Sequence, residues 1–435
     1  MPITSEHLLE ILAQRYLHKL FNQTVDKMQS RSNSLFKNWL SILGPGVITA
    51  ALVFGPSKIT ITSKMGADYG FDLIWVIVIA AFFMMVFTNM ATRIGAQNDE
   101  SLLRLIEKKF GKVTSAIIGI GIFLVTASFQ AGNATGAALS ISERTGSDSK
   151  IWIIVFTGVA ILLLFFRSFY KALEKFMLTM IIIMLIAFLS TAIMIQPSFE
   201  DLAKGLAPSI PKGSTGLIIA FTASCFSVVG AFYQSYLVQS RRKTLGTSSL
   251  PDQEILGSKI GIVLLGVMST SVLVCAAAVL HTQNIKISSA SEMGKALEPL
   301  LGSKAALIFF IGLFGASFSS LIGNAVLGGS LLGDTFGFGN NLNNKVVKAF
   351  IILVMLIGAF VAITFGKAPL ELIVFAQRIT IFLVPFIGII MFLIANDPVI
   401  MKDQVNKPTT KIWAALGLIV LITLAFSNLY NLFIK

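Results

Sequence analysis

The chain has 435 residues, of which 55% are hydrophobic and only 13% are charged, and its formal net charge is +13. A soluble domain must keep a wetted surface, and this composition leaves too few polar residues for one, so the chain belongs in a bilayer. Its Lys and Arg residues lie in short segments between apolar runs, with no basic stripe interleaved with aromatics. The charge therefore indicates membrane topology rather than nucleic-acid binding.

The segment that precedes the first apolar run, residues 1–38, is polar and charged. Its apolar residues recur at helical spacing between charged ones, which favours an amphipathic helix lying on a membrane surface. The residues in this pattern are Leu8, Leu9, Leu12, Tyr16, Leu20 and Phe21, among Glu6, Arg15 and Lys19. We expect 1–38 to be a cytoplasmic N-terminal segment.

Apolar runs of about 18 to 25 residues follow, each long enough to cross roughly 30 Å of hydrocarbon as a helix. They predict about eleven spans, near 40–66, 71–94, 113–140, 151–169, 173–195, 215–239, 256–280, 304–333, 346–366, 369–395 and 412–434. The runs are apolar on every face, whereas the strands of a membrane barrel alternate in polarity. The predicted fold class is an all-α polytopic membrane protein.

Two of these spans share an interruption near their middle. Gly55 to Ser57 places a glycine and a proline inside the first span, and the sixth combines small and β-branched residues from Ser224 to Gly230. Interruptions five spans apart are typical of an inverted repeat whose site lies between two broken helices. A simple kink is the alternative for each, because Gly and Pro are common in membrane helices.

The spans and interruptions predict a domain organisation. We expect a first repeat, a loop, a second repeat, a loop and one final span: 39–195, 196–214, 215–395, 396–411 and 412–435. Lys and Arg are more frequent in alternate loops, which under the positive-inside rule puts the N-terminus in the cytoplasm and the C-terminus outside. The loop 196–214 is then extracytoplasmic and 396–411 cytoplasmic. The expected location is the cell's inner (plasma) membrane.

Several segments, in order, resemble one family of transporters. They are Leu43 to Gly46, Phe54 to Ile59, Gly66 with Ala67, Glu100 to Gly111, Tyr236 to Arg241, Gly312 to Ser320 and Ala376 to Phe386. The sequence over 40–395 thereby resembles the Nramp (natural resistance-associated macrophage protein) family of divalent metal transporters. The resemblance implies a LeuT-like inverted repeat of five plus five helices with one extra helix. It also implies proton-coupled uptake of manganese or ferrous iron.

The metal-binding residues that this family implies are replaced here. Its first-helix Asp and Asn positions become Gly55 and Lys58, and its sixth-helix Met becomes Ser227. The following sixth-helix positions hold Val228 and Gly230, a later family histidine falls at Gln234, and the acidic third helix carries Gln130 and Asn133. The family positions are thus poor metal ligands in this chain.

The residues themselves lead to the same difficulty. Metal sites use carboxylate, imidazole or thiolate ligands, yet no Asp or Glu lies deep in a span. What the spans do hold is Lys58 and Arg378, and an intramembrane charge is a functional candidate by default. Each has a structural alternative: Lys58 bonds unwound carbonyls or reaches the interface, and Arg378 pairs with Glu371. The amides of Gln130, Asn133, Gln234 and Gln377 either line a site or join helices.

The combined hypothesis is a secondary transporter that moves a small solute by alternating access, by resemblance a divalent metal cation of the manganese or iron type. Two alternatives remain: a transporter of a small anionic, zwitterionic or neutral solute, and a transport-inactive membrane sensor. The candidate substrate-binding residues are Gly55, Pro56, Ser57, Lys58, Ser227, Val228, Gly230, Gln130, Asn133, Gln234, Gln377 and Arg378. No nucleophile–base pair or phosphate loop suggests an enzyme. We expect no cofactor, no nucleic acid and no obligate protein partner; the expected partners are the lipid bilayer and the solute.

Overall fold

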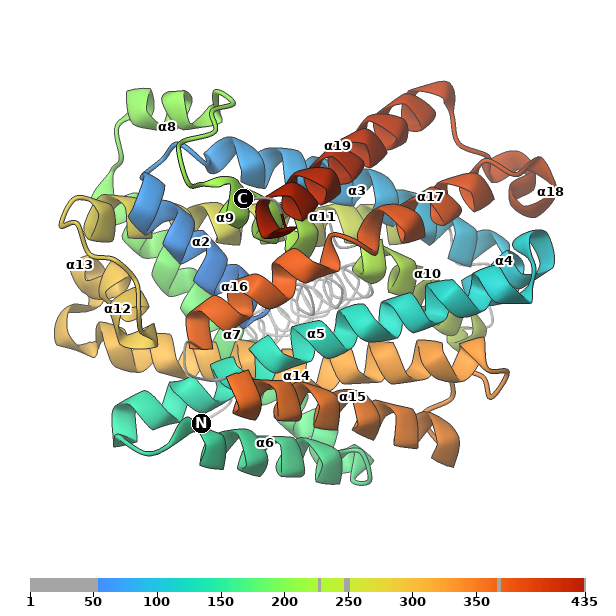
Figure 1. Cartoon of the computed structure of the whole chain (residues 1–435), viewed down its shortest axis with the longest axis horizontal. Helices are drawn as coiled ribbons and strands as arrows, with labels where there is room; N and C mark the ends of the chain where they lie inside the picture. The colour runs from blue at the N-terminus through green and yellow to red at the C-terminus, as the bar shows by residue number, and fades with distance from the viewer. Residues whose placement is uncertain (1–53, 226–227, 246–250, 366–368, 434–435) are drawn as a thin grey trace, which may run out of the picture. The chain divides into compact units, whose positions relative to one another are not determined.

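The computed structural model describes residues 54–225, 228–245, 251–365 and 369–433. The chain divides into two compact units, 1–44 and 45–435, and every described residue belongs to the second. The expected amphipathic helix within 1–38 and the first part of the first span lie outside the described residues. Throughout the described part the chain forms helices and no strands (Figure 1).

The described helices follow the expected spans closely. They are α2 (Pro56–Tyr69), α3 (Ile74–Gln97), α4 (Leu102–Phe110), α5 (Lys112–Thr145), α6 (Ser149–Leu163), α7 (Arg167–Ile195), α8 (Phe199–Leu206), α9 (Thr215–Cys225), α10 (Val228–Leu245), α11 (Pro251–Ala276), α12 (Ala290–Gly294), α13 (Glu298–Leu301), α14 (Ala305–Thr335), α15 (Lys345–Phe365), α16 (Pro369–Thr380), α17 (Val384–Ala395), α18 (Pro398–Met401) and α19 (Pro408–Phe433). A π-helical turn, η1 (Ala277–His281), extends α11, and 3₁₀ turns lie at η2 (Lys295–Leu297), η3 (Gly302–Lys304) and η4 (Lys402–Gln404).

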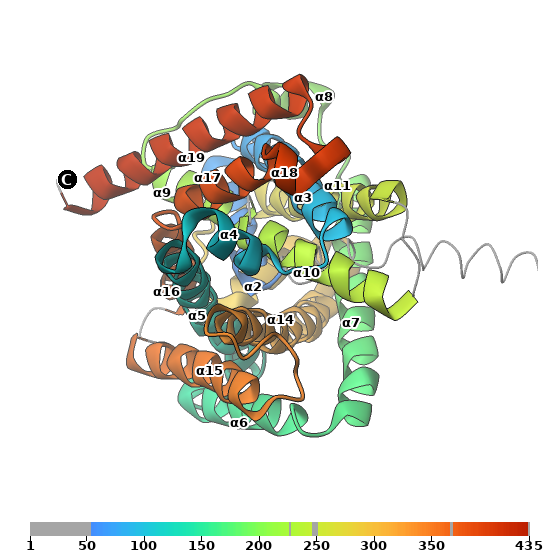
Figure 2. The same cartoon turned by 90° about the vertical axis from the view of Figure 1, so that its right-hand side faces the viewer.

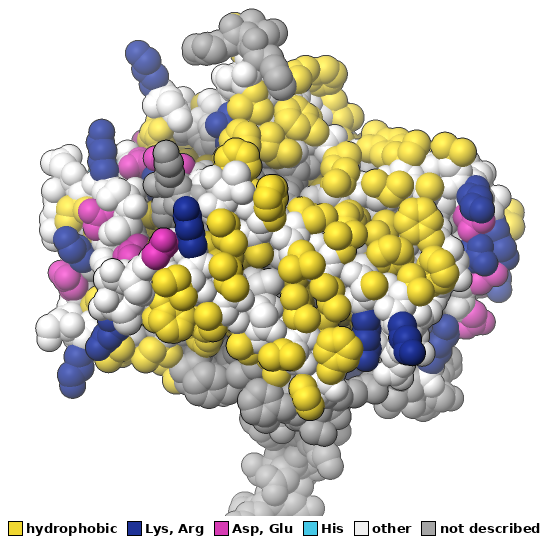
Figure 3. Space-filling model, turned by 60° about the horizontal axis from the view of Figure 1, so that its bottom comes forward, with side chains coloured by type: hydrophobic (Ala, Val, Ile, Leu, Met, Phe, Trp, Pro, Cys, Tyr) yellow, Lys and Arg dark blue, Asp and Glu magenta, His cyan; other side chains and the backbone are white. Residues whose placement is uncertain are grey.

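Length and composition identify membrane spans among these helices. In the described residues seven helical segments are long and apolar enough to cross a bilayer, and nine if each of two bent pairs is one span. Within the described residues, α6 is a further apolar helix that is shorter than these. Apolar side chains cover the middle of the face in Figure 3, and charged ones gather toward its margins. That distribution suits a surface in contact with lipid.

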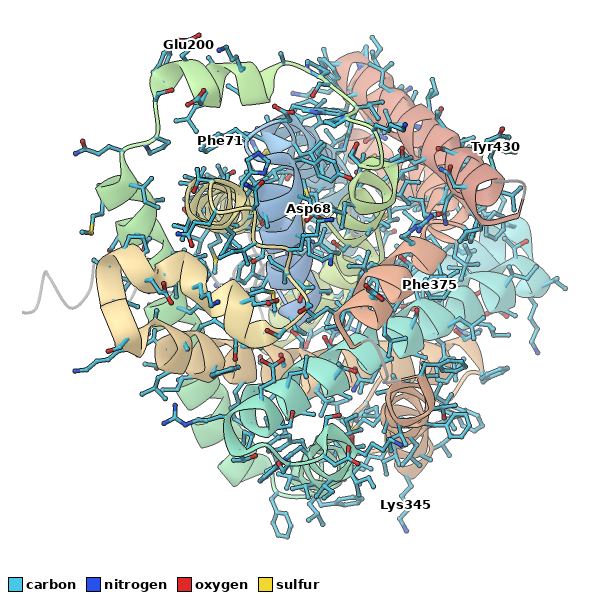
Figure 4. All side chains as sticks on the ribbon, turned by 60° about the vertical axis from the view of Figure 1, so that its left-hand side comes forward. Asp68, Phe71, Glu200, Lys345, Phe375 and Tyr430 are labelled. Carbon is cyan, nitrogen blue, oxygen red and sulfur yellow. The ribbon has the colours of Figure 1, made fainter. Side chains whose placement is uncertain are left out.

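α2 runs through the interior of the helix bundle. It packs against α9, α11, α5, α14 and α16, and eleven of its fourteen residues are buried. Figure 2 shows α17 and α19 together along one margin of the bundle and α6 and α15 along the opposite one, with α2 between these pairs. In Figure 4, Asp68 labels α2 and Phe375 lies on the neighbouring α16. The first residues of α2, from Pro56 to Ser63, are all buried, so the helix begins in the interior of the protein.

The structure also departs from the expected elements. The tenth span, expected to be continuous over 369–395, is broken into α16 and α17, which meet at an angle of 41°. Pro385 explains the break, because its ring nitrogen cannot donate to the carbonyl one turn earlier. The loop expected at 196–214 contains a short helix, α8, which Ser198 caps by accepting a hydrogen bond from the Asp201 N–H.

Candidate functional site

The candidate site begins where α2 begins. Pro56 is the first residue of the helix, a position where the missing proline N–H costs nothing, and Gly55 precedes it in extended conformation. Gly55, the N-cap residue, has no side chain with which to cap this helix start. The interruption predicted at Gly55 to Ser57 thus coincides with a helix N-terminus that lies in the core, where first-turn N–H groups such as that of Ser57 have no intrahelical acceptor.

Two serine hydroxyls of α14 lie beside this helix start. A Cβ atom on Gly55 would stand 2.8 Å from the Ser320 Oγ and 3.5 Å from the Asn133 Oδ1. One turn of α14 earlier, the Ser317 Oγ and the Cβ of Pro56 both lie within 2.6 Å of the point that a Cβ on Gly136 would occupy. Glycine at positions 55 and 136 therefore lets α2, α5 and α14 approach closely around the break.

These hydroxyls are buried without a bonding partner. Ser317 is 0% exposed and Ser320 1% exposed, and neither Oγ has a hydrogen-bond partner among the described residues. A buried polar group without a partner costs about 1–3 kcal/mol, so each one calls for an explanation. Neither serine is among the residues selected from the sequence, because small residues in a membrane span usually pack helices together. Their spacing of three along one helix face was the available signal.

Lys58 lies on the α9 side of the same helix turn. Its side chain is fully buried, its Nζ donates to the Ser224 Oγ at 3.1 Å, and its ammonium lies 5.4 Å from the centre of the Phe221 ring. Among the described residues it forms no ion pair. Ser224 stands near the end of α9, three residues before Ser227. Lys58 thus contributes a buried positive charge next to the break.

The other candidate amides divide between the site and helix contacts. Asn133 donates to the Gln130 Oε1 at 3.3 Å, and Gln130 in turn donates to the Leu321 carbonyl, which ties α5 to α14 beside Gly55. Gln234 lies farther along α10 and donates to the Ser258 Oγ of α11 at 3.0 Å. Gln377 of α16 is 1% exposed, and its buried Oε1 has no hydrogen-bond partner in the part of the chain that the structure describes.

The sixth-span candidates are only partly described. Ser227 lies outside the described residues, between the end of α9 at Cys225 and the start of α10 at Val228, so the interruption predicted over Ser224 to Gly230 is described only in part. Val228 and Gly230 are buried in the first turn of α10. The Val228 side chain faces α17, 3.8 Å from the point that a Cβ on Gly388 would occupy.

Arg378 belongs to a different part of the molecule. Its Nε and one terminal nitrogen donate to the Asn428 Oδ1 of α19 at 3.2 and 3.0 Å, and the Asn428 Nδ2 donates back to the Arg378 carbonyl at 3.0 Å. The guanidinium also lies over Gly216, at the start of α9. Glu371, the partner that the sequence suggested, makes no ion pair with it among the described side chains. Arg378 therefore joins α16 to α19.

A carboxylate holds the connection between α11 and α14. Glu143, near the end of α5, accepts hydrogen bonds from the backbone N–H groups of Ala290 and Ser291, each at 2.8 Å. These two residues begin α12, where unpaired N–H groups and the helix dipole favour a negative charge. The first turn of α12 is therefore fastened to α5.

The described part of this site contains no cluster of metal ligands. Within 54–225, 228–245, 251–365 and 369–433, no group of three or more His, Cys, Asp or Glu side chains is placed to hold a metal ion. The polar groups around the start of α2 are hydroxyls, amides and one ammonium.

One known protein family matches the chain along most of its length. The family model described as natural resistance-associated macrophage protein-like matches residues 46–431. The chain belongs to the Nramp family. Among its relatives, the divalent metal cation transporter MntH of Deinococcus radiodurans is 26% identical over 370 residues, covering 82% of this chain and 83% of the relative. The MntH of Listeria innocua is 25% identical over 421 residues, covering 93% and 92%.

Solved structures share the fold of this Nramp-family chain. A crystal structure of the Eremococcus coleocola manganese transporter, in complex with an aromatic bis-isothiourea substituted compound, superposes with a TM-score of 0.74 at 20% identity. The superposition covers 92% of this chain and 89% of the manganese transporter chain. MHP1, a nucleobase-cation-symport-1 family transporter in a closed conformation, gives a TM-score of 0.59 at 14% identity, covering 88% and 91%. The expected LeuT-like all-α membrane fold is confirmed.

Proposed function

We propose that this Nramp-family chain is a secondary transporter that moves a small solute across the membrane by alternating access. The observation that carries the proposal is the uncapped start of α2 inside the bundle, beside Ser317, Ser320 and Lys58. A helix that begins at this depth presents backbone donors to a solute, and broken helices form the binding sites of many secondary transporters. The relatives named above, which are transporters, support the same reading.

The relatives make a divalent metal cation of the manganese or iron type the first cargo to test. One observation favours a second class, a small anionic, zwitterionic or neutral solute. Lys58 fills a family ligand position with a positive charge, and a divalent cation 4 Å away would be repelled by about 2 kcal/mol even in water. The repulsion grows several-fold where water is scarce, as around a side chain that is 0% exposed.

Flux measurements in proteoliposomes test the proposal. The purified chain is reconstituted, and the uptake of Mn²⁺ is compared with that of amino acids and small organic acids against empty liposomes. We expect uptake of at least one solute above the empty-liposome rate, and slow uptake of Mn²⁺. A chain that carries none of these solutes would contradict transport and favour a membrane sensor. Rapid Mn²⁺ uptake would instead return the metal cation to first place.

A charge-reversal variant tests the reason given for poor metal binding. The double substitution Gly55→Asp with Lys58→Asn adds a carboxylate and removes the ammonium, which changes the local charge by two units. We expect tighter Mn²⁺ binding in calorimetry, provided that the Ser320 hydroxyl rotates away from the new side chain. Transport should not recover fully, because Gln130 and Asn133 replace the acidic residues of the third span. Micromolar Mn²⁺ binding by the unmodified chain would contradict this explanation.

The finer topology is part of the same proposal. We infer two repeats over 39–195 and 215–395, an extracytoplasmic loop over 196–214, a cytoplasmic loop over 396–411 and a final span over 412–435. The distribution of Lys and Arg supports a cytoplasmic N-terminus, an outside C-terminus and the cell's inner (plasma) membrane. Family membership supports a transporter without enzymatic activity. Cysteine labelling of Ser209→Cys and Lys402→Cys in intact cells checks the orientation, since only the former should react from outside.

A further inference from the structure

We propose that the start of α2 binds the carboxylate group of the transported solute, with Ser317 and Ser320 as hydroxyl donors and Lys58 as the compensating charge. This inference rests on the proposed function, because it names the chemical class of solute for the same site. It concerns a small monocarboxylate or an amino acid rather than a bare metal cation.

The first argument is the pair of buried serines. A hydroxyl that is 0% or 1% exposed and makes no hydrogen bond is a donor without an acceptor. The Ser320 Oγ lies 2.8 Å from the point that a Cβ on Gly55 would occupy, and the Ser317 Oγ and the Pro56 ring both face the Cβ position of Gly136. Both hydroxyls therefore border the uncapped helix start. An anionic oxygen placed there would accept from these hydroxyls and from the Ser57 N–H.

The start of α2 carries positive charge from two sources. A helix N-terminus carries a partial positive charge, and α2 is fourteen residues long with no acidic residue in its first turn. Lys58 adds a full positive charge within that turn, with Ser224 and the Phe221 ring as its partners among described side chains. The backbone dipole and the ammonium therefore have the same sign. A buried anion would compensate both.

The third argument concerns which anion suits the site. One ammonium balances one negative charge, which favours a monoanion over a dianion such as hydrogen phosphate. A carboxylate has two oxygens that accept several hydrogen bonds, matching two hydroxyls and a backbone N–H. Asn133 directs its Oδ1 toward Gly55 at 3.5 Å from the Cβ position. Rotation of that amide would present its Nδ2 instead, at the loss of the weak bond to Gln130.

The experiment measures binding rather than flux. The purified full-length chain in detergent is heated with acetate, propionate or glycine, and in parallel with acetamide, propionamide or glycinamide, at constant ionic strength. A bound ligand raises the melting temperature by mass action. We expect at least one carboxylate to stabilise the protein while its matched amide does not. Equal shifts from a carboxylate and its amide, or no shift with any carboxylate, would overturn the proposal.

Single substitutions then locate the bound group. Ser320→Ala removes one donor and should weaken carboxylate binding about tenfold, the effect of losing one hydrogen bond to a charged group. Ser330→Ala is the matched control, because Ser330 lies on the same helix, is 3% exposed and donates to the Leu327 carbonyl. It should leave the affinity within about twofold of the unmodified chain. Equal affinity in Ser320→Ala and Ser330→Ala would place the carboxylate elsewhere and overturn the assignment.

Binding and flux separate this inference from the proposed function. Carboxylate binding that Ser320→Ala weakens, in a chain that moves no solute in liposomes, would support the site and contradict transport. Mn²⁺ flux without carboxylate binding would support transport and contradict the site. Size-exclusion profiles check that each variant is folded, and the comparison of acids with amides on the unmodified chain requires no variant.

Discussion

Lys58 and Arg378 are two cations within membrane spans, and their surroundings differ in kind. Arg378 exchanges three hydrogen bonds with Asn428, through its side chain and its carbonyl, so two helices hold one group. Lys58 is fully buried, and among the described residues its ammonium has one hydroxyl and one aromatic ring. The contrast indicates that Arg378 stabilises the fold and that Lys58 can still bind a ligand.

The largest effect is expected from breaking the hydrogen bonds between Arg378 of α16 and Asn428 of α19. Asn428→Ala should lower the free energy of unfolding by about 3 kcal/mol, because it leaves a half-buried guanidinium without its acceptor. Denaturant titration in mixed micelles measures the change. Replacing both partners, Arg378→Met with Asn428→Leu, should recover most of the loss. A double variant as unstable as Asn428→Ala would show that packing, rather than hydrogen bonding, joins these helices.

The close packing of helices around the start of α2 provides the next test. Gly136→Ala should destabilise the protein by about 1–3 kcal/mol, since the new methyl group would meet Ser317 and Pro56. Gly158→Ala on α6 is the matched control, because no atom lies within 4 Å of its Cβ position. Alanine there should be neutral or stabilising by up to about 1 kcal/mol. Equal effects in the same unfolding assay would mean that the helices at the break are not closely packed.

Lys58 itself should matter little for stability. Lys58→Met keeps the length of the side chain and removes a buried charge, so we expect a stability within about 1 kcal/mol of the unmodified chain, or above it. Thermal unfolding without ligand measures this, and carboxylate binding should be lost in the same variant. A large loss of stability would mean that the ammonium is a structural group like Arg378, and the contrast between the two would fail.

A third cation, at the aqueous surface, extends the comparison to the smallest effect. Lys109 pairs with Asp397, and this hydrogen bond holds the pKa of that carboxyl below its ordinary value. Because the pKa of Asp397 is lower in the folded protein, the ion pair stabilises the fold at pH values above the carboxyl's ordinary pKa of about 4. This stabilisation is lost as the pH falls through the pKa of the folded protein. Lys109→Met should therefore cost less than about 1 kcal/mol at pH 7. The difference in melting temperature should vanish in acid; a difference that persists there would rule out the ion pair as its source.

Local chemistry made some of this architecture predictable. The start of α2 follows from Gly55 and Pro56, because a proline acts on the turn that contains it. Pro385 carried the same signal for the break between α16 and α17, but the apolar residues around it are continuous and predicted an unbroken span. Hydropathy measures length in the membrane and is insensitive to a bend.

Contacts between distant segments were beyond such patterns. Arg378 finds its partner fifty residues away on another helix, whereas Glu371 was the nearest charge on its own face. Ser317 and Ser320 belong to a span rich in small residues, where close packing of helices is the usual explanation. Only the three-dimensional arrangement shows that these two hydroxyls border the break and have no acceptor.

The attachment of α12 to α5 has a kinetic consequence. If the loop that carries α12 moves away from α5 during the transport cycle, the two hydrogen bonds to Glu143 break on opening and re-form on closing. Each is a charge-assisted bond, so the pair stabilises the closed arrangement and must be broken before the loop can open. A residue outside the binding site would then influence the rate of turnover, and a change at Glu143 should shift the balance between closed and open forms toward the open one.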